Sequence, residues 1–504
     1  MSARLFFKCV LFVLTLLAAL PSAYADQVHV TLLHVNDIYQ LMPVDKGTRG
    51  GLARLATLRD SIRSESPNTL LILGGDTLSP SVSSNTFRGA QMIAGWNAVG
   101  LDLAVLGNHE FDFGPEVLKT RMAESKFPWV TANVLDMAAG GKAVGTAVPS
   151  LLKEFGGIKI GFVGVVTQST LKSSMPGPDM RFLDPRQTVK QEADRLRALG
   201  ARYVVAVTHL DMAEDLRLAS DNSVNLVLGG HDHDLMKSLD GLVPVFKAGS
   251  DTRNVVRIDL RFDTANSELP AMDWIVLPVT AAIAENKAVA DVVAFYEKQV
   301  AERYGQPLGT TSVELDARQS AVRSGETNLG NWLADVFREN VKADVALING
   351  GSIRSNSTYG PGTLTRRDML TLLPFDNPII KLRITGRVLR DALEYGLSEL
   401  HSSRESGRYP QISGMRVKYD VRRPVGQRVI SIEIAGRGLD DGAEYTIAVN
   451  DYLGRGGDGY AMFKDLPRVI TAENGRTETV EAIERLSIAG SIAPKLDGRM
   501  QLVE

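Results

Sequence analysis

Six short apolar segments occupy the first half of the chain. They read VHVTLLHVND, TLLILGGD, LAVLGNHE, IKIGFVGVV, YVVAVTHL and NLVLGGHDHD, and a further apolar run follows them to about residue 260. Each is rich in leucine or β-branched residues and has the length of a buried strand. Helical patterns lie between several of them, for example over residues 51–64 and 188–199. This alternation predicts an α/β fold in which helices cover layered sheets.

Polar or glycine-rich clusters follow five of these segments directly. Only IKIGFVGVV lacks one; the other five end in Asn36-Asp37, Gly74-Gly75-Asp76, Asn108-His109-Glu110, Thr208-His209 and His231-Asp232-His233. Ligands of α/β sheets bind at the carboxyl ends of the strands, so we expect these side chains to converge. A single cluster of this kind is usually a turn or a hydrogen-bonded histidine. Five together, all with oxygen or nitrogen donors, predict a site for two divalent cations such as Zn, Mn, Fe or Mg.

The first 25 residues predict a secretory signal peptide. Arg4 and Lys8 precede an apolar run over residues 10–20, and Ala23-Tyr24-Ala25 provides a small-residue cleavage site. The run is short for a membrane span, so an uncleaved anchor is the weaker alternative and we expect no stable anchor after cleavage. Cys9 is the only cysteine, which leaves the mature chain without disulfides or thiolate ligands. We therefore expect a periplasmic or secreted protein.

Length and charge restrict the remaining classes of protein. A chain of 504 residues is too long for one ordinary domain. Its 44% hydrophobic and 23% charged residues are typical of globular proteins and not of disordered or multi-span membrane chains. The 56 basic and 59 acidic residues give a net charge of −3, which argues against binding a nucleic acid polymer through bulk positive charge. We expect a small-molecule partner, and the sequence leaves the oligomeric state open.

A stretch rich in helix-forming residues divides the chain into two domains. Residues 281–303 contain neither glycine nor proline and predict a helix, which Tyr304-Gly305-Gln306-Pro307 would end. We expect the signal peptide over residues 1–25, the metal-binding domain over 26–280, a linker helix over 281–308 and a second α/β domain over 309–504. In the last, ADVALING, IIKLRITG and EYTIAVNDYL predict strands, and residues 330–339 and 387–400 predict helices.

Polar and aromatic clusters in the second domain predict a substrate pocket. Glycines beside Asn349 and Arg354 let backbone N–H groups and a guanidinium approach an anion closely. Phe375 and Tyr452 stand on separate loops and could sandwich a flat ring. Asp458 lies in a glycine turn and suits the vicinal hydroxyls of a sugar. Singly these features are also typical of hairpin turns and core aromatics, so it is their combination that indicates a nucleoside-type ligand.

The order D…GGD…GNHE…H…GHxH resembles the calcineurin-like metallophosphoesterases. The second-domain clusters narrow the resemblance to the secreted 5′-nucleotidases, which include periplasmic UDP-sugar hydrolases and 2′,3′-cyclic-nucleotide phosphodiesterases. The resemblance covers essentially the whole mature chain. It implies an α/β fold built as a four-layer metallophosphoesterase β-sandwich with flanking helices, a linker helix and a second α/β C-terminal domain. It also implies two divalent metal ions as cofactors.

Roles for the first-domain residues follow from the resemblance. Asp37 would bind the first metal, Asp76 would bridge both metals, and His233 would return to the first. Asn108, His209 and His231 would bind the second metal. His109 and Asp112 would form a catalytic pair in which Asp112 orients the imidazole and His109 stabilises charge or protonates the leaving oxygen. Asp112 could instead cap the following helix, and the role of Glu110 is open.

The resemblance assigns substrate contacts in the same way. Arg323, Asn349 and Arg354 would contact phosphate or other substrate oxygens. Phe375 and Tyr452 would form the aromatic clamp, while Asn377 and Asp458 would contact the base edge and the ribose.

One position departs from the family pattern. The 5′-nucleotidases usually have Asp-x-His after the first strand, whereas this chain has Asp37-Ile38-Tyr39. Tyr39 could line the pocket while His233 and water complete the shell of the first metal. It could bind as a phenolate, which would favour a harder ion such as Fe³⁺, or the first metal could be weak and exchangeable. The tyrosine pKa of about 10 favours the first alternative.

The sequence therefore predicts metal-dependent hydrolysis of nucleotide phosphate esters, of the 5′-nucleotidase type, by a hydroxide that two metal ions activate. UDP-sugars, 2′,3′-cyclic nucleotides and sugar phosphates are alternative substrates. A periplasmic nucleotide-binding protein with little turnover is the non-enzymatic alternative.

Overall fold

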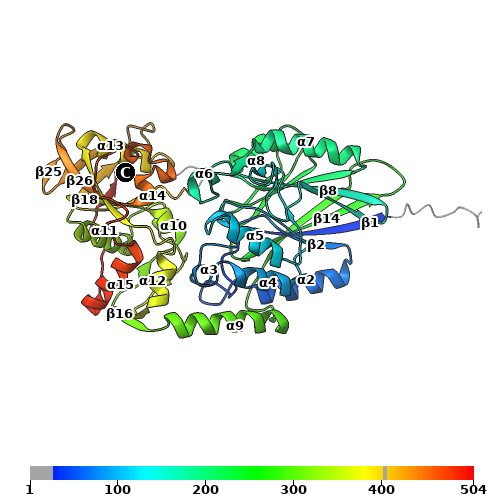
Figure 1. Ribbon diagram of the computed structural model, residues 1–504, viewed down its shortest axis with the longest axis horizontal. Helices are drawn as coiled ribbons and strands as arrows, with labels where there is room; N and C mark the ends of the chain where they lie inside the picture. The colour runs from blue at the N-terminus through cyan, green and yellow to red at the C-terminus, as the bar shows by residue number, and fades with distance from the viewer. Residues whose placement is uncertain (1–26, 401–405, 504) are drawn as a thin grey trace, which may run out of the picture.

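The structure of the protein, a computed structural model, describes residues 27–400 and 406–503. The signal peptide expected over residues 1–25 lies outside the described residues. Figure 1 shows two domains, and the long helix α9 (Lys287–Tyr304) runs along the lower side of the first and leads to strand β16 (Pro307–Thr311) of the second. In the described part of the chain, no helix has both the length and the hydropathy needed to cross a bilayer.

Two six-stranded sheets form the centre of the first domain. The first sheet has the order β15-β14-β1-β2-β3-β4 and the second has the order β12-β13-β11-β10-β8-β7. The strands of the first are β1 (Gln27–Val35), β2 (Thr69–Leu73), β3 (Leu103–Val105), β4 (Trp129–Val130), β14 (Asn254–Asp263) and β15 (Ala271–Pro278). Those of the second are β7 (Ser150–Phe155), β8 (Ile158–Val166), β10 (Tyr203–His209), β11 (Leu226–Gly229), β12 (Leu235–Ser238) and β13 (Val245–Ala248).

Parallel pairing brings the predicted polar clusters to one edge of these sheets. Strands β1 to β4 run parallel to one another, and so do β8, β10, β11 and β13. The carboxyl ends of β1, β2 and β3 therefore share one edge of the first sheet, and those of β10 and β11 share one edge of the second. The apolar side chains between the two sheets form one buried cluster, in which Leu32 and Ile72 pack with Phe162 and Val205.

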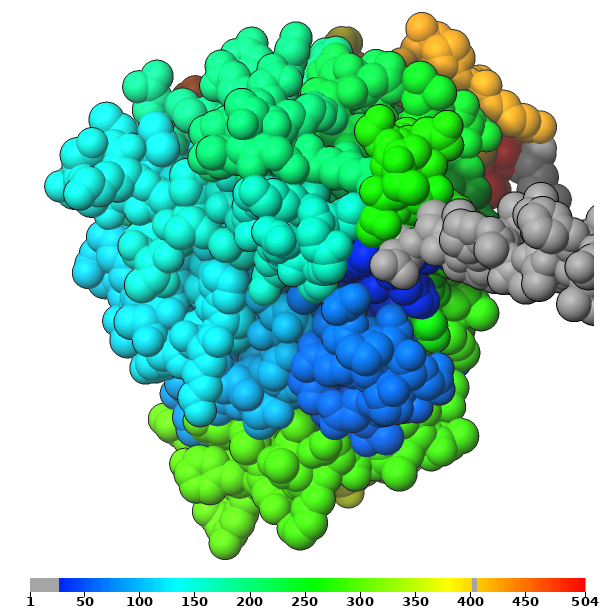
Figure 2. Space-filling model, turned by 90° about the vertical axis from the view of Figure 1, so that its right-hand side faces the viewer, coloured from blue at the N-terminus to red at the C-terminus, as the bar shows by residue number. Residues whose placement is uncertain are grey.

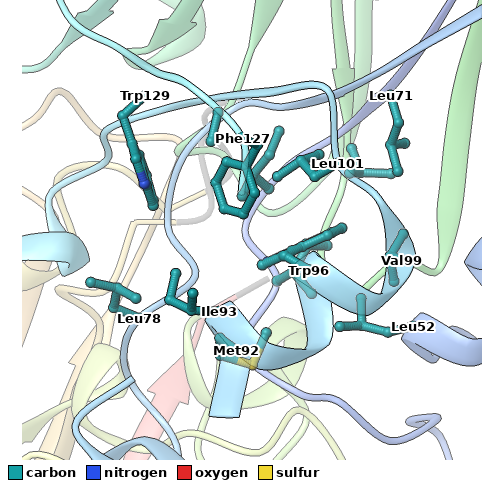
Figure 3. Close-up of a cluster of buried hydrophobic side chains, with 14 of the residues drawn as sticks. Leu52, Leu71, Leu78, Met92, Ile93, Trp96, Val99, Leu101, Phe127 and Trp129 are labelled. Carbon is teal, nitrogen blue, oxygen red and sulfur yellow. The ribbon is translucent and has the colours of Figure 1, made fainter. Parts of the chain in front are cut away.

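Helices cover the outer faces of both sheets. The layer on the first sheet contains α2 (Leu52–Glu65), α4 (Ala90–Val99) and α5 (Pro115–Glu124), and the layer on the second contains α7 (Pro185–Ala198) and α8 (Met212–Ala219). Trp96 of α4 is fully buried in the first layer, among side chains that include Leu52 and Phe127 (Figure 3), and its indole N–H donates to Thr77 Oγ1 at 2.8 Å. Figure 2 shows α9 in light green at the bottom, α2 in blue above it and the α7 region at the top. The predicted four-layer fold is confirmed.

The linker helix begins later than the sequence pattern predicts. Helix α9 starts at Lys287 because Asn286 caps it: the Asn286 side chain accepts hydrogen bonds from the N–H groups of Ala288 and Val289 at 3.1 and 3.3 Å. Val289 and Val293 are buried against the layer of α2 and α4, so the helix is held to the first domain along its first half.

The second domain is built on a five-stranded sheet of order β22-β18-β26-β21-β27. Its strands are β18 (Val345–Asn349), β21 (Ile379–Thr385), β22 (Pro410–Ser413), β26 (Glu444–Asn450) and β27 (Arg468–Ile470). Helices α11 (Asn328–Asn340), α12 (Arg366–Leu372) and α15 (Glu478–Ala489) pack on one face. Helix α13 (Gly386–Gly396) packs on the other, with a second sheet of β23 (Met415–Tyr419), β24 (Val429–Ile434), β25 (Arg437–Gly438) and β29 (Met500–Leu502).

This sheet also brings its polar loops to one edge. Strands β18 and β26 are parallel and end at Asn349 and Asn450. Strand β21 is antiparallel to β26, so it begins at that same edge, next to the loop that carries Phe375 and Asn377. The predicted substrate clusters therefore share one rim of the second domain.

A buried lysine joins the two loops that carry the histidines of the second sheet. Lys247 on β13 has no exposed side-chain surface, and its Nζ lies 2.8 Å from Asp215 Oδ2 and 2.7 Å from Asp232 Oδ2. It also donates to the backbone carbonyls of Leu210 and Gly230 at 2.6 and 2.7 Å. These carbonyls follow His209 and precede His231, so one cation fixes both loops.

Lys247→Met is expected to destabilise the first domain by about 3–5 kcal/mol, because the fully buried Asp215 and the partly buried Asp232 would lose their counter-ion. Urea unfolding followed by circular dichroism measures this. Lys298→Met is the matched control, since its side chain is 76% exposed and its ion pair with Glu302 is long at 3.9 Å. A Lys247→Met midpoint equal to that of the control would contradict the assignment.

Candidate functional site

Three of the predicted ligands lie on strained backbone just beyond a strand. Asp37, Asp76 and His231 have φ values of 55°, 57° and 75°, in the left-handed region that non-glycine residues rarely adopt. Such conformations persist only where the surrounding structure enforces them, and they are concentrated at functional sites. Here the sharp turns let side chains from several adjacent strands converge on one point.

A cluster of carboxylates and imidazoles occupies that point. One donor atom each from Asp37, Asp76 and His209 lies within 4.8 Å of the other two, and all three residues are buried. The His209 Nδ1–H donates to the Gly74 carbonyl at 2.8 Å, so in neutral His209 the Nε2 lone pair faces Asp76 Oδ2 at 3.2 Å. Burial lowers the pKa of His209, but Asp76 and Asp37 outweigh it and raise the pKa to about 10. A positive charge among these side chains therefore stabilises the cluster.

Unsatisfied lone pairs indicate that this charge is a cation. Asn108 Oδ1 is buried without a hydrogen-bond partner, and in neutral His209 the Nε2 lone pair meets only a carboxylate, which is costly unless a ligand is present. The backbone N–H of His231 donates to Asp37 Oδ2 at 2.9 Å, and the His231 ring lies 5.1 Å from the His209 ring. His233 Nε2 is 3.3 Å from Asp37 Oδ1. The donor set thus fits divalent cations.

Tyr39 lies inside this cluster. Its hydroxyl oxygen is 3.0 Å from Asp37 Oδ1, 3.1 Å from Asp76 Oδ2 and 2.9 Å from His233 Nε2. The ring is 7% exposed and its hydroxyl contacts three of the predicted ligands, so the three alternatives for its role stay predictions. Without a cation, burial and the two carboxylates raise the pKa of Tyr39 well above its ordinary value.

Glu110 is a structural residue whose role sequence patterns do not reveal. It is buried, and its carboxylate accepts hydrogen bonds from four backbone N–H groups, those of Asp76, Thr77, Leu78 and Gly107. Burial raises the pKa of Glu110 to about 7. The side chain fastens the loop after β2 to the loop after β3 and so places Asp76 beside Asn108.

His109 and Asp112 form the expected pair. His109 Nδ1 lies 2.7 Å from Asp112 Oδ2, and the hydroxyl of Ser174 donates to Asp112 Oδ1 at 2.6 Å. Asp112 does not cap the next helix, whose N-cap is Gly114. Burial lowers the pKa of His109, but Asp112 and Asp76 raise it above its ordinary value. Ser174 follows helix α6 (Thr170–Ser173), far away in the sequence, and no motif marks it.

The two rims face each other across one cavity of about 580 Å³. Phe375 of the second domain stacks on His109 of the first, with ring centroids 6.1 Å apart and planes at 19°. The Arg354 guanidinium lies 5.4 Å from the Phe375 ring centroid and 5.7 Å from that of Tyr39. His233 Nδ1 lies 3.1 Å from Gln319 Oε1 across the same interface. The metal-type cluster and the substrate-type loops therefore belong to one site.

The other second-domain candidates line this cavity as well. Asn349 donates to Asp458 Oδ2 at 2.6 Å, and the Tyr452 hydroxyl donates to Asp458 Oδ1 at 2.9 Å. Asn377 donates instead to Glu478 Oε1 at 3.2 Å, a buried acid that sequence patterns do not single out. Arg323 also lies on the cavity wall. All seven predicted substrate residues therefore share one cavity.

Comparison with known proteins identifies the family. The calcineurin-like phosphoesterase family matches residues 30–235, and the 5′-nucleotidase C-terminal domain matches residues 307–465. The chain belongs to the 5′-nucleotidase family of calcineurin-like phosphoesterases. Members of this family are phosphoric ester hydrolases that use divalent metal ions. The resemblance expected from the motifs is confirmed.

Individual relatives extend over nearly the whole chain. The crystal structure of a 5′-nucleotidase precursor from Thermus thermophilus has a TM-score of 0.84 and 29% identity, covering 94% of this chain and 99% of that one. Snake venom 5′-nucleotidase of Naja atra is 28% identical over 93% of this chain and 98% of its own length. The trifunctional nucleotide phosphoesterase protein YfkN of Bacillus subtilis (strain 168) is 27% identical over 94% of this chain, which spans only 35% of that longer relative.

Substituting His209 and His109 should show which of the two binds the metal and which acts as the acid. His209→Ala is expected to lower metal affinity by at least about 10-fold, since even outer-sphere changes at metal sites cost about 10–100-fold. His109→Ala should retain the metal but lower kcat by about 10²–10⁴. Metal content after dialysis and phosphate release measure the two effects. Metal loss in His109→Ala would show that His109 is a ligand.

Proposed function

We propose that this chain hydrolyses phosphate esters of nucleosides, with nucleoside 5′-monophosphates as its preferred substrates. The observation that carries the proposal is the shared cavity, in which Phe375 stacks on His109 beside the metal-type cluster. A volume of about 580 Å³ is within the range of small-molecule sites. The relatives named 5′-nucleotidase and nucleotide phosphoesterase support the same substrate class.

The metal-binding set would consist of residues from five loops. Asp37, Asp76, Asn108, His209, His231 and His233 would hold two divalent ions. When bound, such ions supply Lewis-acid polarisation of a phosphoryl group. Glu110 and Lys247 keep the loops in register without contacting the substrate.

His109 would act on the leaving group. Asp112 accepts from Nδ1 and is itself held by Ser174, so the imidazole is fixed with Nε2 free to donate a proton. The guanidinium of Arg354, next to the His109–Phe375 stack, would stabilise the negative charge of the phosphate. Arg323 would add a second positive charge on the same side of the cavity.

The rim of the second domain would bind the nucleoside. Phe375 and Tyr452 would contact the base, with Asn377 at its edge. Asp458 is held by Asn349 and Tyr452, and each carboxylate oxygen retains a lone pair for a ribose hydroxyl. The hydroxyl of Tyr452 thus holds the Asp458 carboxylate in place, which a phenylalanine at position 452 could not do.

We also propose that the chain is exported to a periplasm and that its signal peptide ends at residue 25. The first domain would end at residue 280 and the linker at residue 308. The signal-type sequence before Asp26 and the positions of the two family matches support this. Mass spectrometry of the secreted protein tests it, with an N-terminus at Asp26 as the expected result.

A panel of phosphate esters tests the substrate. The highest kcat/KM is expected for a nucleoside 5′-monophosphate, ahead of UDP-glucose, 2′,3′-cyclic AMP, glucose 6-phosphate and p-nitrophenyl phosphate. Preference for one of the others would replace the proposed substrate. Tight nucleotide binding with no phosphate release after Mn²⁺ addition would instead indicate a binding protein.

Aromatic substitutions test base contact. Tyr452→Ala should lower kcat/KM for the nucleotide by about 5–150-fold, the effect of removing about 1–3 kcal/mol of stacking, with little change for p-nitrophenyl phosphate. Phe375→Ala should do the same. Each variant also removes one further contact, the stack on His109 for Phe375 and the hydrogen bond to Asp458 for Tyr452, so both are measured. Phe295→Ala, on the 62% exposed ring of α9, is the control. Equal losses on both substrates would exclude base stacking.

A further inference from the structure

We propose that the phenolic oxygen of Tyr39 is a direct metal ligand and completes a four-donor site with Asp37 Oδ1, Asp76 Oδ2 and His233 Nε2. This inference rests on the proposed metal centre and specifies one of its two positions. At this position the family pattern has a histidine ligand, and here the ligand would be an anionic oxygen.

The count of protons around the Tyr39 hydroxyl supports a cation. The hydroxyl carries one proton but lies 3.0 and 3.1 Å from two carboxylate oxygens, so it can donate to only one of them. In neutral His233 the one ring proton lies on Nδ1 when that atom donates to the Gln319 amide oxygen, which is 3.1 Å away. In neutral His233 the Nε2 lone pair then points at Tyr39 and Asp37. In that state four lone-pair atoms share one proton, and a cation among them would satisfy the remaining lone pairs.

The distances from Tyr39 Oη to the other three atoms match those between ligands of one ion. Tyr39 Oη lies 2.9–3.1 Å from the other three, and His233 Nε2 lies 3.3 Å from Asp37 Oδ1. Tetrahedral ligands about 2.0 Å from an ion are about 3.3 Å apart, and ligands in adjacent octahedral positions are about 3 Å apart.

The surroundings of the ring are suited to an anionic oxygen. Asp37 is fully buried and Tyr39 nearly so, which keeps water from replacing the phenol. The Arg354 guanidinium lies over the ring face, 5.7 Å from its centroid, where it stabilises added electron density in the ring. Coordination would release the hydroxyl proton to solvent, as metal binding does for other protonated ligands.

The two metal positions would then differ in chemistry. Three oxygens and one imidazole, two of the oxygens from carboxylates and one from a phenolate, favour a hard ion of high charge such as Fe³⁺. The other position, with Asn108, His209 and His231 beside Asp76, has two imidazoles and favours Zn²⁺ or Mn²⁺. We therefore expect two different ions in one chain.

Metal analysis of Tyr39 variants tests the proposal. The full chain is stripped of metal and reloaded with Fe³⁺ and Zn²⁺, and bound iron, bound zinc and the visible absorption spectrum are measured. Wild type should hold one iron and one zinc and show a phenolate-to-iron charge-transfer band. Tyr39→Phe should lose the band and at least about 10-fold in iron affinity while keeping zinc. Tyr39→His should hold two ions without the band.

Tyr203→Phe is the matched control, since it removes another buried tyrosine hydroxyl of the same domain, outside the cluster. Melting temperatures show whether each variant is folded. Iron and an unchanged spectrum in folded Tyr39→Phe would overturn the proposal, as would wild type that holds only zinc. If phosphate release from nucleotides persists in those cases, the proposed function stands and only the role of Tyr39 fails.

Discussion

The concentration of negative charge and lone pairs at one sheet edge is the constraint on which the rest of the structure depends. Asp37 and Asp76 are buried side by side, and buried charges of like sign are stable only with a counter-ion. Left-handed backbone at both residues adds strain. The fold offsets these costs with a large apolar core between two sheets, and the scaffold residues Glu110 and Lys247 hold the loops that the core alone would leave loose.

The proposed function depends on surfaces of both domains, which line one cavity. The cluster of carboxylates and imidazoles is suited to ions that would polarise a phosphoryl group, and a base would need an apolar surface beside it. Phe375 and the loops beside it supply that surface from the other domain and reach His109 itself. In the proposed function, the phosphate of the substrate binds at one wall of the cavity and its organic group at the other.

Much of this arrangement could be predicted because it is local in the sequence. Each predicted ligand lies at the end of a strand or a few residues beyond it, and parallel pairing brings strand ends to one edge. The sequence patterns did not assign the roles of Glu110, Ser174, Lys247 and Glu478. These residues act on partners far away in the chain or on backbone groups. Their function depends on which loops meet, and no short pattern contains that information. The late start of α9 has the opposite cause, since a cap at Asn286 outweighs the favourable composition before it.

The sequence alone determined the donor types, their order along the chain and the family, because adjacent motifs specify them. It also determined the two-domain division, because hydrophobic periodicity specifies that division. Only the tertiary structure decided where the Tyr39 oxygen lies and that Phe375 meets His109. Tyr39 is separated from His233 by 194 positions and His109 from Phe375 by a whole domain, yet each pair is in contact. Side-chain positions of this kind follow from the packing of distant elements, which fixes distances that sequence separation does not.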